Sequence, residues 1–208
     1  MKKVIKVLII LIVLILVIVF GMYFNKYRII SNYQKKVLDV LKSDNYSMEL
    51  KQENENENVS NIFVKNNITV ISDNNIYIII DNNTNKQYFV SSAIENNVKE
   101  MSDEEKIKVQ PSIFSNCGII DDSSIFSLIK ADSKMKLSSL EYNNKKCYKI
   151  ETDSSNTKSE FTVIFDKETK LPVAIQNGKD SKVYNVKVEI GNVQDSDVSL
   201  EDIVSKLK

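Results

Sequence analysis

The sequence contains no histidine and no tryptophan, and its 208 residues include only one arginine, two cysteines, two prolines and four glycines. The absence of histidine excludes imidazole metal ligands, Ser-His-Asp and Cys-His nucleophile systems, and the side chain best suited to proton transfer near pH 7. From residue 25 onward there are 25 basic and 28 acidic residues. This balance provides no positive stripe to follow a phosphate backbone, so we expect no nucleic-acid partner.

Catalytic motifs are equally scarce. Ser127 and Lys130 match the S-x-x-K spacing of one class of serine enzymes, and Ser72-Asp73-Asn74 matches the associated S-D-N. In this chain the S-D-N lies upstream of the S-x-x-K, and no K-T-G is present. The cysteines do not form a C-x-x-C, the spacing of redox and zinc sites. We therefore expect no enzymatic activity, no catalytic residue, no cofactor and no metal site.

A long apolar run near the amino terminus predicts a membrane anchor. Val7 to Phe24 are 18 residues without a charge, and as a helix they span roughly 27 Å, close to the thickness of a bilayer core. No small-residue cleavage site follows, as it would in a secretory signal peptide. We expect residues 1–24 to be an uncleaved transmembrane helix of a single-pass cell-membrane protein. Basic residues are almost balanced on the two sides, but long domains behind such anchors are usually exported, which predicts an extracellular C-terminal domain.

The hydrophobic period changes twice after the anchor. Ile30, Tyr33, Val37 and Leu41 have helical spacing, which predicts a juxtamembrane helix at residues 25–43. Residues 44–208 form the predicted extracytoplasmic domain, where apolar residues mostly alternate with polar ones between asparagine-rich turns. The predicted strands are Tyr46–Leu50, Val59–Lys65, Ile68–Ser72, Ile76–Asp81, Lys86–Val90, Leu137–Tyr142, Lys146–Asp153, Glu160–Asp166, Leu171–Asn177 and Lys182–Ile190.

The middle of the domain predicts helices instead. Ile94, Val98 and Met101 have helical spacing, and a capping box at residues 102–105 predicts a short helix that ends before Pro111. A further helix is expected from Asp121 or Asp122, and a helix is also expected to start near Asp195. Together the elements predict an α+β fold, in which a curved antiparallel sheet of about 9 to 11 strands is covered by short helices.

The order of elements and one late segment resemble a known superfamily. The segment is Phe161-Thr162-Val163-Ile164-Phe165-Asp166-Lys167-Glu168-Thr169-Lys170-Leu171-Pro172-Val173. It is similar to the Asp-x-x-Thr-x-Leu-Pro hairpin of the LolA/LppX-like lipoprotein-carrier superfamily. The resemblance implies a half-barrel closed by helices, with an apolar cavity that accepts acyl chains without covalent chemistry. Members of that superfamily are usually soluble or lipid-modified, whereas this chain has a predicted membrane-spanning segment.

Apolar residues of the predicted sheet could line such a cavity, or they could form an ordinary filled core. Sequence alone leaves both alternatives open. The candidate ligand-binding residues are Tyr46, Met48, Ile78, Tyr88, Phe126, Phe161, Val163, Phe165, Tyr184 and Val186.

Cys117 and Cys147 form a possible disulfide. An even number of cysteines favours a bond in an extracytoplasmic domain, where it would stabilise the fold by about 3 to 4 kcal/mol. Two separate thiols are the alternative. Cys147 has the opposite strand parity to Tyr148 and Ile150, which predicts that its sulfur lies away from the main core.

These features predict a membrane-anchored, extracytoplasmic, non-catalytic binding protein of a bacterium with an AT-rich genome. Its expected ligand is a lipid or the acyl chain of a lipoprotein. The alternative is an interaction or sensor domain of the cell envelope, with a filled core and a protein partner.

Overall fold

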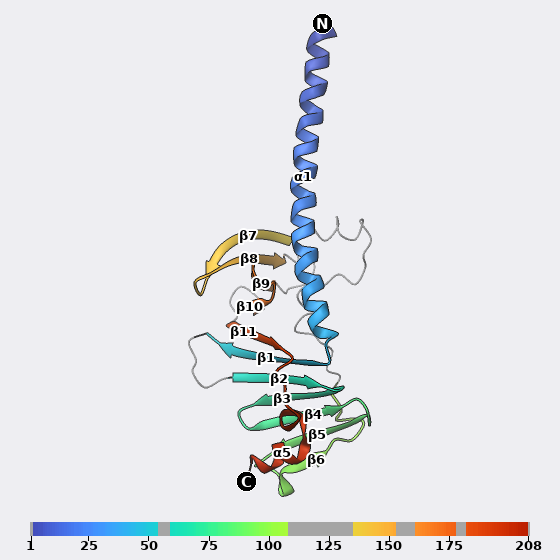
Figure 1. Cartoon of the computed structure of the whole chain (residues 1–208), viewed down its shortest axis with the longest axis vertical. Helices are drawn as coiled ribbons and strands as arrows, with labels where there is room; N and C mark the ends of the chain where they lie inside the picture. The colour runs from blue at the N-terminus through green and yellow to red at the C-terminus, as the bar shows by residue number, and fades with distance from the viewer. Residues whose placement is uncertain (1, 54–58, 108–134, 153–160, 178–181, 208) are drawn as a thin grey trace.

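A computed structural model of the chain describes residues 2–53, 59–107, 135–152, 161–177 and 182–207. A long helix, α1 (Lys2–Leu41), leads into one open, curved sheet of eleven strands, and short helices follow the last strand (Figure 1). This arrangement confirms the predicted α+β class. The strands are β1 (Asn45–Gln52), β2 (Val59–Lys65), β3 (Ile68–Asp73), β4 (Ile76–Asp81), β5 (Lys86–Ser91), β6 (Val98–Glu100), β7 (Met135–Tyr142), β8 (Lys145–Thr152), β9 (Phe161–Asp166), β10 (Pro172–Asn177) and β11 (Val183–Ile190).

The strand order is β6-β5-β4-β3-β2-β1-β11-β10-β9-β8-β7, and neighbouring strands are antiparallel throughout. The first and last strands therefore pair at the centre of the sheet, and each half is a meander of neighbouring hairpins. This topology confirms the predicted meander, because parallel crossovers would have separated consecutive strands.

Asparagine forms the tight turns of these hairpins. Asn66 and Asn67, Asn74 and Asn75, and Asn143 and Asn144 are pairs of residues with φ between 46° and 66°. Two consecutive residues in the left-handed region make a type I′ turn, whose twist matches that of the flanking strands. Asparagine is the residue other than glycine that adopts this conformation most readily. A chain with four glycines thus builds its hairpins with asparagine.

Two predictions from the middle of the chain change. Val98, placed on a predicted helix with Ile94 and Met101, instead begins strand β6, which pairs with β5. A short 3-10 helix, η1 (Glu95–Asn97), precedes it. The tertiary pairing with β5 therefore overrides the helical spacing. The short helix predicted after Ser102 is also wrong as far as the described residues reach, since residues 103–105 form only a turn before Ile107. The Glu105 carboxylate still accepts hydrogen bonds from the backbone N–H and hydroxyl of Ser102 at 3.0 and 3.2 Å, which is one half of a capping box. The helix predicted from Asp121 or Asp122 lies outside the described residues.

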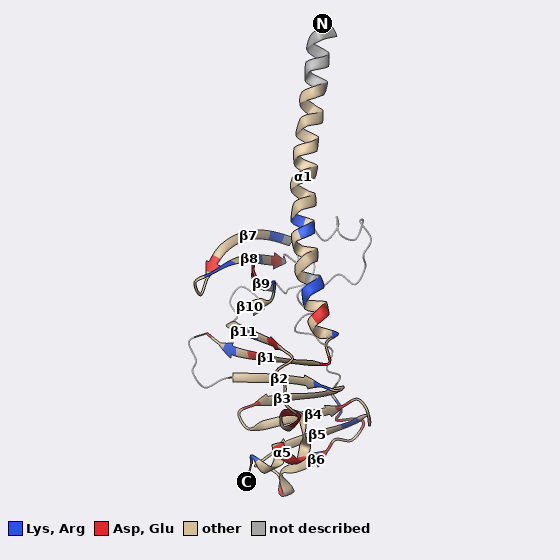
Figure 2. Cartoon of the chain, viewed as in Figure 1, with Lys and Arg blue, Asp and Glu red and all other residues tan. Residues whose placement is uncertain are grey.

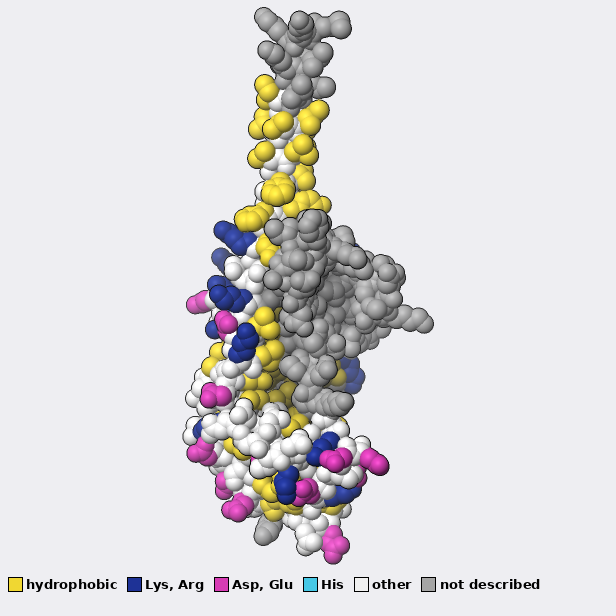
Figure 3. Space-filling model, turned by 90° about the vertical axis from the view of Figure 1, so that its right-hand side faces the viewer, with side chains coloured by type: hydrophobic (Ala, Val, Ile, Leu, Met, Phe, Trp, Pro, Cys, Tyr) yellow, Lys and Arg dark blue, Asp and Glu magenta, His cyan; other side chains and the backbone are white. Residues whose placement is uncertain are grey.

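Helix α1 is one unbroken element of 40 residues that combines two environments. From Ile10 to Phe24 its large apolar side chains are between 42% and 74% exposed. They cover the face of the helix that is visible in Figure 3. The helix is long and apolar enough to cross a membrane, by length and composition. Farther along, Ile30, Tyr33 and Val37 are at most 7% exposed. The second part of the helix therefore belongs to the folded domain.

The two faces of the sheet are covered by different ends of the chain. Met48 and Ile62 pack on one face together with α1, which we call the α1 face. Phe63, the next residue, packs on the opposite face with Val198 of α4 (Asp195–Val198) and Ile203 of α5 (Leu200–Ser205). We call this the α5 face. Because successive strand residues point to opposite sides, these contacts assign a face to every strand position through the pairing register.

Candidate functional site

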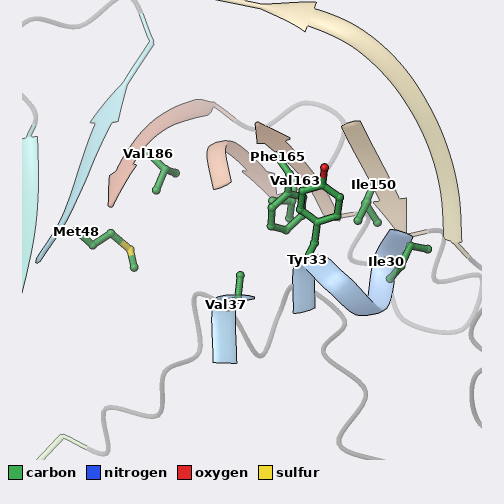
Figure 4. Packing of buried hydrophobic residues seen from close by; sticks show 8 residues of the cluster. All are labelled: Ile30, Tyr33, Val37, Met48, Ile150, Val163, Phe165 and Val186. Atoms are coloured by element: carbon green, nitrogen blue, oxygen red, sulfur yellow. The ribbon is translucent and has the colours of Figure 1, made fainter. Parts of the chain in front are cut away.

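A cluster of buried side chains joins α1 to the sheet, and we call it the α1 cluster. Three of its members come from α1 and five from strands β1, β8, β9 and β11, and each is at most 7% exposed. In Figure 4 the helix side chains point at those of the strands. The packing closes this half of the α1 face as a filled core. The cluster consists of Ile30, Tyr33, Val37, Met48, Ile150, Val163, Phe165 and Val186.

Tyr33 lies at the centre of the α1 cluster. Its ring is 5.1 Å from the ring of Phe165 and 5.8 Å from that of Tyr148, centroid to centroid, and the second pair is edge to face. Both distances fall in the range where aromatic pairs attract each other beyond simple burial. Burial raises the pKa of Tyr33 to about 12, with smaller contributions from Tyr148 and Asp166. The phenol is therefore neutral at physiological pH and serves packing.

An apolar row continues on the α1 face beyond the end of α1. The register places Met48 opposite Ile62, Ile62 opposite Ile71, Ile71 opposite Ile78, and Ile78 opposite Phe89. Residues directly opposite in antiparallel strands share a face, so these side chains form one line across the strands. We call Ile62, Ile71, Ile78 and Phe89 the apolar stripe. It begins at Met48 of the α1 cluster and crosses β2 to β5.

The environment of the stripe differs from that of the α1 cluster. All four stripe side chains are half-buried, and Ile76, on the same face of β4, is 43% exposed. Beside the stripe the Gln87 side chain donates a hydrogen bond to the Ile107 carbonyl and accepts one from the Ile107 N–H, both at 2.9 Å. This pair holds the chain after β6 against the α1 face. The apolar stripe therefore ends on β5 beside the two hydrogen bonds between Gln87 and Ile107.

The structure brings some predicted ligand residues together and separates others. Met48, Val163, Phe165 and Val186 meet in the α1 cluster. Tyr46 is 8% exposed and Tyr184 is 37% exposed, and both lie on the α1 face by register. Ile78 belongs to the apolar stripe. Tyr88 lies on the opposite face, against the cluster around Val90 and Ile203. Phe161 begins β9, but its side chain and the whole of Phe126 lie outside the described residues.

Three residues of the apolar stripe were not among the predicted ligand-binding residues, although the sequence contains a signal for them. Ile62, Ile71 and Phe89 are ordinary alternating strand residues. Their alignment becomes visible only when the Asn66-Asn67 and Asn74-Asn75 pairs are interpreted as two-residue turns, which fix the register of each hairpin.

Cys147 lies on the α5 face in a small cluster with Ile164 and Ala174, as its strand parity predicted. Its side chain is fully buried, and burial raises the pKa of its thiol. Cys117 lies outside the described residues, so its pairing with Cys147 stays a prediction.

The Asp-x-x-Thr segment that carries the family resemblance has a structural role here. The Asp166 side chain is 7% exposed, accepts a hydrogen bond from the Glu168 N–H at 2.8 Å and lies 3.5 Å from the Lys145 ammonium. Burial alone would raise the pKa of Asp166, but the backbone hydrogen bond and the Lys145 charge outweigh it and lower that pKa. The Thr169 hydroxyl accepts from the Leu171 N–H at 3.3 Å. These contacts fix the β9–β10 turn, in which Lys170 has φ 60°.

Among the described residues no group of three or more acidic or cysteine side chains could hold a metal ion. The α1 cluster and the stripe that continues it are both made of apolar side chains. What the arrangement can do chemically is to hold an apolar group by non-covalent contact, next to a helix that is itself suited to a membrane.

Comparison with known proteins gives structural likeness only. The complex of Pseudomonas aeruginosa MucA and MucB matches with TM-score 0.44 and 8% identity, covering 83% of this chain and 60% of that one. A MucB structure matches with TM-score 0.44 and 6% identity, over 81% of this chain and 62% of that one. MucB in complex with MucA(peri) matches with TM-score 0.36 and 8% identity, over 79% and 57%.

This chain spans about three fifths of the length of those MucB chains. At such identities and TM-scores the function of MucB does not transfer to it. No protein-family model matches the sequence, and no curated protein matches it either.

Proposed function

We propose that this chain is a non-catalytic binding protein, anchored in the cell membrane by α1, that binds a lipid acyl chain along the apolar stripe. The observation that carries the proposal is the continuity of the α1 face. On strands β8 to β1 the apolar side chains of this face are covered by helix α1. On strands β2 to β5 the apolar stripe continues the same row of side chains. A half-buried apolar line beside a filled core is the part of the face where a ligand can still gain contacts.

Membrane anchoring is supported by the first part of α1. A run of exposed apolar side chains from Ile10 to Phe24 would be costly in water, whereas a bilayer core removes all of it from water. The domain begins within the same helix, with no intervening linker, because Ile30 is already buried against the sheet. We place the domain on the outer side of the membrane, since long domains behind an N-terminal anchor are usually exported.

The dimensions of the stripe suit an extended hydrocarbon chain. Its four side chains stand on adjacent strands, which are about 4.8 Å apart, so the line is about 14 Å long. Each methylene that such a chain buries contributes about 0.8 kcal/mol. The resemblance to the LolA/LppX-like superfamily, which implies binding of acyl chains, supports the same ligand class.

A photoreactive fatty acid tests the proposal with the full chain in lipid nanodiscs. The fatty acid carries a diazirine at its methyl end, and mass spectrometry locates the adducts. We expect adducts on β2 to β5, and we expect Ile78→Asn to reduce them several-fold. Ile76→Asn is the matched control, because Ile76 lies on the same strand and face but has the polar neighbours Asp73 and Ser91 in register. Equal labelling of both variants, or no label on these strands, would refute the proposal that the stripe binds an acyl chain.

The filled α1 cluster favours a second candidate, an interaction domain of the envelope that binds a protein instead of a lipid. In that case the nanodisc experiment gives no adduct on the stripe. A photoreactive amino acid at Ile76 or Tyr184, both more than a third exposed, would instead trap a protein in intact cells. The two experiments together distinguish a lipid ligand from a protein partner.

A further inference from the structure

The strands are stacked along the axis of α1, so the sheet has an end near the apolar half of the helix and an end far from it. Ile30 packs beside Ile150 of β8, and Tyr33 packs on Phe165 of β9 (Figure 4). Leu41, at the end of the helix, packs against the same cluster close to β1. Strand β7 is therefore the one nearest the exposed apolar half of α1, as Figure 1 shows.

Helix and strand spacings give the depth of β7. Ile30 is six residues beyond Phe24, the last residue of the exposed apolar run, which is about 9 Å along the helix axis. Strand β7 lies one strand spacing, about 4.8 Å, closer to Phe24 than β8 does. The edge of the sheet is thus about 4 Å below the apolar run. The headgroup layer of a bilayer is about 5 to 7 Å thick on each side.

Charge is distributed unevenly along the same axis. Among the described residues, the half near the apolar run (residues 25–42, 135–152, 161–177 and 182–190) has 13 basic and 6 acidic residues. The far half (residues 43–53, 59–107 and 191–207) has 6 basic and 14 acidic residues. Figure 2 shows basic positions on α1 beside β7 and on the β7–β8 hairpin. The excess of positive charge therefore lies on the side that faces the membrane.

Several of these cations are available to an external anion. Arg28, Lys136 and Lys146 are exposed, and within the described part of the chain none of them forms an ion pair. By contrast, Lys149 lies 2.7 Å from Glu151, and Lys145 lies 3.5 Å from Asp166. The available cations are on α1 just after the apolar run, on the edge strand, and on the hairpin that this strand forms.

We propose that Arg28, Lys136 and Lys146 form a membrane-contact surface on the folded domain that binds anionic lipid headgroups, such as phosphatidylglycerol. The inference rests on the proposed anchoring by α1, since the anchor brings this surface to headgroup depth. Each basic residue near an anionic membrane strengthens the contact about fivefold. The surface fixes the domain on the bilayer, and its far, acidic half then points away from the membrane.

Lysine acylation of the full chain in nanodiscs tests this surface. One set of discs contains only phosphatidylcholine, and the other contains about one third phosphatidylglycerol. A water-soluble ester modifies accessible lysines, and mass spectrometry measures the rate at each position. We expect Lys136 and Lys146 to react about fivefold more slowly in the anionic discs and to recover in 1 M salt, where the screening length is about 3 Å. Lys86 and Lys206, in the far half, should react equally in both discs.

Charge reversal provides the second measurement. Lys146→Glu should restore much of the reactivity of Lys136 in anionic discs. The control is Lys206→Glu, which changes an exposed lysine of the far half and should leave the reactivity of Lys136 unchanged. Equal rates for Lys136 in neutral and anionic discs would overturn the membrane-contact surface. Failure of the chain to elute with either kind of disc would instead overturn the anchoring, so the two failures are distinguishable.

Discussion

Replacing Tyr33 by alanine should lower the free energy of unfolding of the domain by about 3 to 5 kcal/mol. The ring is 4% exposed and lies 5.1 Å from Phe165 and 5.8 Å from Tyr148, so the substitution removes a buried aromatic side chain and two ring contacts. Because the strands around Tyr33 belong to one continuous sheet, they cannot collapse fully into the space left behind. The result therefore measures how firmly α1 is packed into the domain.

The assay is urea unfolding of the full chain in nanodiscs, followed by far-ultraviolet circular dichroism of the sheet. With a slope of about 2 kcal/mol per molar urea, the midpoint should fall by about 1.5 to 2.5 M. Tyr33→Phe keeps the ring and should cost no more than about 1 kcal/mol. Tyr23→Ala is the matched control, because Tyr23 is a tyrosine of the same helix that is 59% exposed. If Tyr33→Ala and Tyr23→Ala unfold at the same urea concentration, α1 does not stabilise the sheet.

Three further predictions concern the turns and the topology. Asp166 has a lowered pKa, so its contribution to the free energy of unfolding is complete above its ordinary pKa near 4 and is lost as the pH falls through the lower folded value. Asp166→Asn should therefore cost about 1 to 3 kcal/mol at pH 7 and make the protein lose less stability between pH 7 and pH 3. If urea unfolding shows the same loss between these pH values in the variant and the original protein, the prediction is contradicted. Asn75→Val should cost about 1 to 2 kcal/mol because Asn75 has φ 66°, whereas Asn61→Val, in the extended strand β2, should have little effect; equal thermal midpoints would refute the role of the turn. We expect protease added to intact cells to digest the domain, because we propose that it lies outside the membrane. Full protection would mean that the domain lies on the cytoplasmic side.

Much of the sheet could be predicted from the sequence because its strands alternate strongly and its turns are rich in asparagine. Ile68 to Asp81, for example, reads as two strands around Asn74 and Asn75, and the structure has β3 and β4 there. Val98 is the counterexample. Its helical spacing relative to Ile94 and Met101 is a pattern of single residues, while β6 is created by antiparallel pairing with the preceding strand β5.

The position of the site could not be derived in the same way. That β1 and β11 pair at the centre of the sheet depends on contacts over most of the chain, so neither face could be assigned to a given strand. Tyr88 was therefore grouped with Met48, although the two lie on opposite faces. The packing of Tyr33 was foreseeable as an apolar helix position, but its partners Phe165 and Tyr148 were not.

The abundance of asparagine also has a structural use that composition alone concealed. Nine of the ten described residues other than glycine with positive φ are asparagines, and the tenth is Lys170. A coding bias toward asparagine and away from glycine thus remains compatible with tight hairpins, since asparagine supplies the left-handed conformation.

Isoleucine methyl spectroscopy with a spin-labelled fatty acid tests the acyl-chain proposal most directly, because it reports each face of the sheet separately. In the full chain in nanodiscs, the label should broaden the methyl signals of Ile62, Ile71 and Ile78 on the α1 face. It should leave those of Ile79 and Ile203, which are buried on the α5 face, nearly unchanged. Broadening confined to the isoleucines between Ile10 and Ile18, which the proposed anchor exposes to lipid, would mean that the fatty acid enters only the membrane and that the stripe binds no acyl chain.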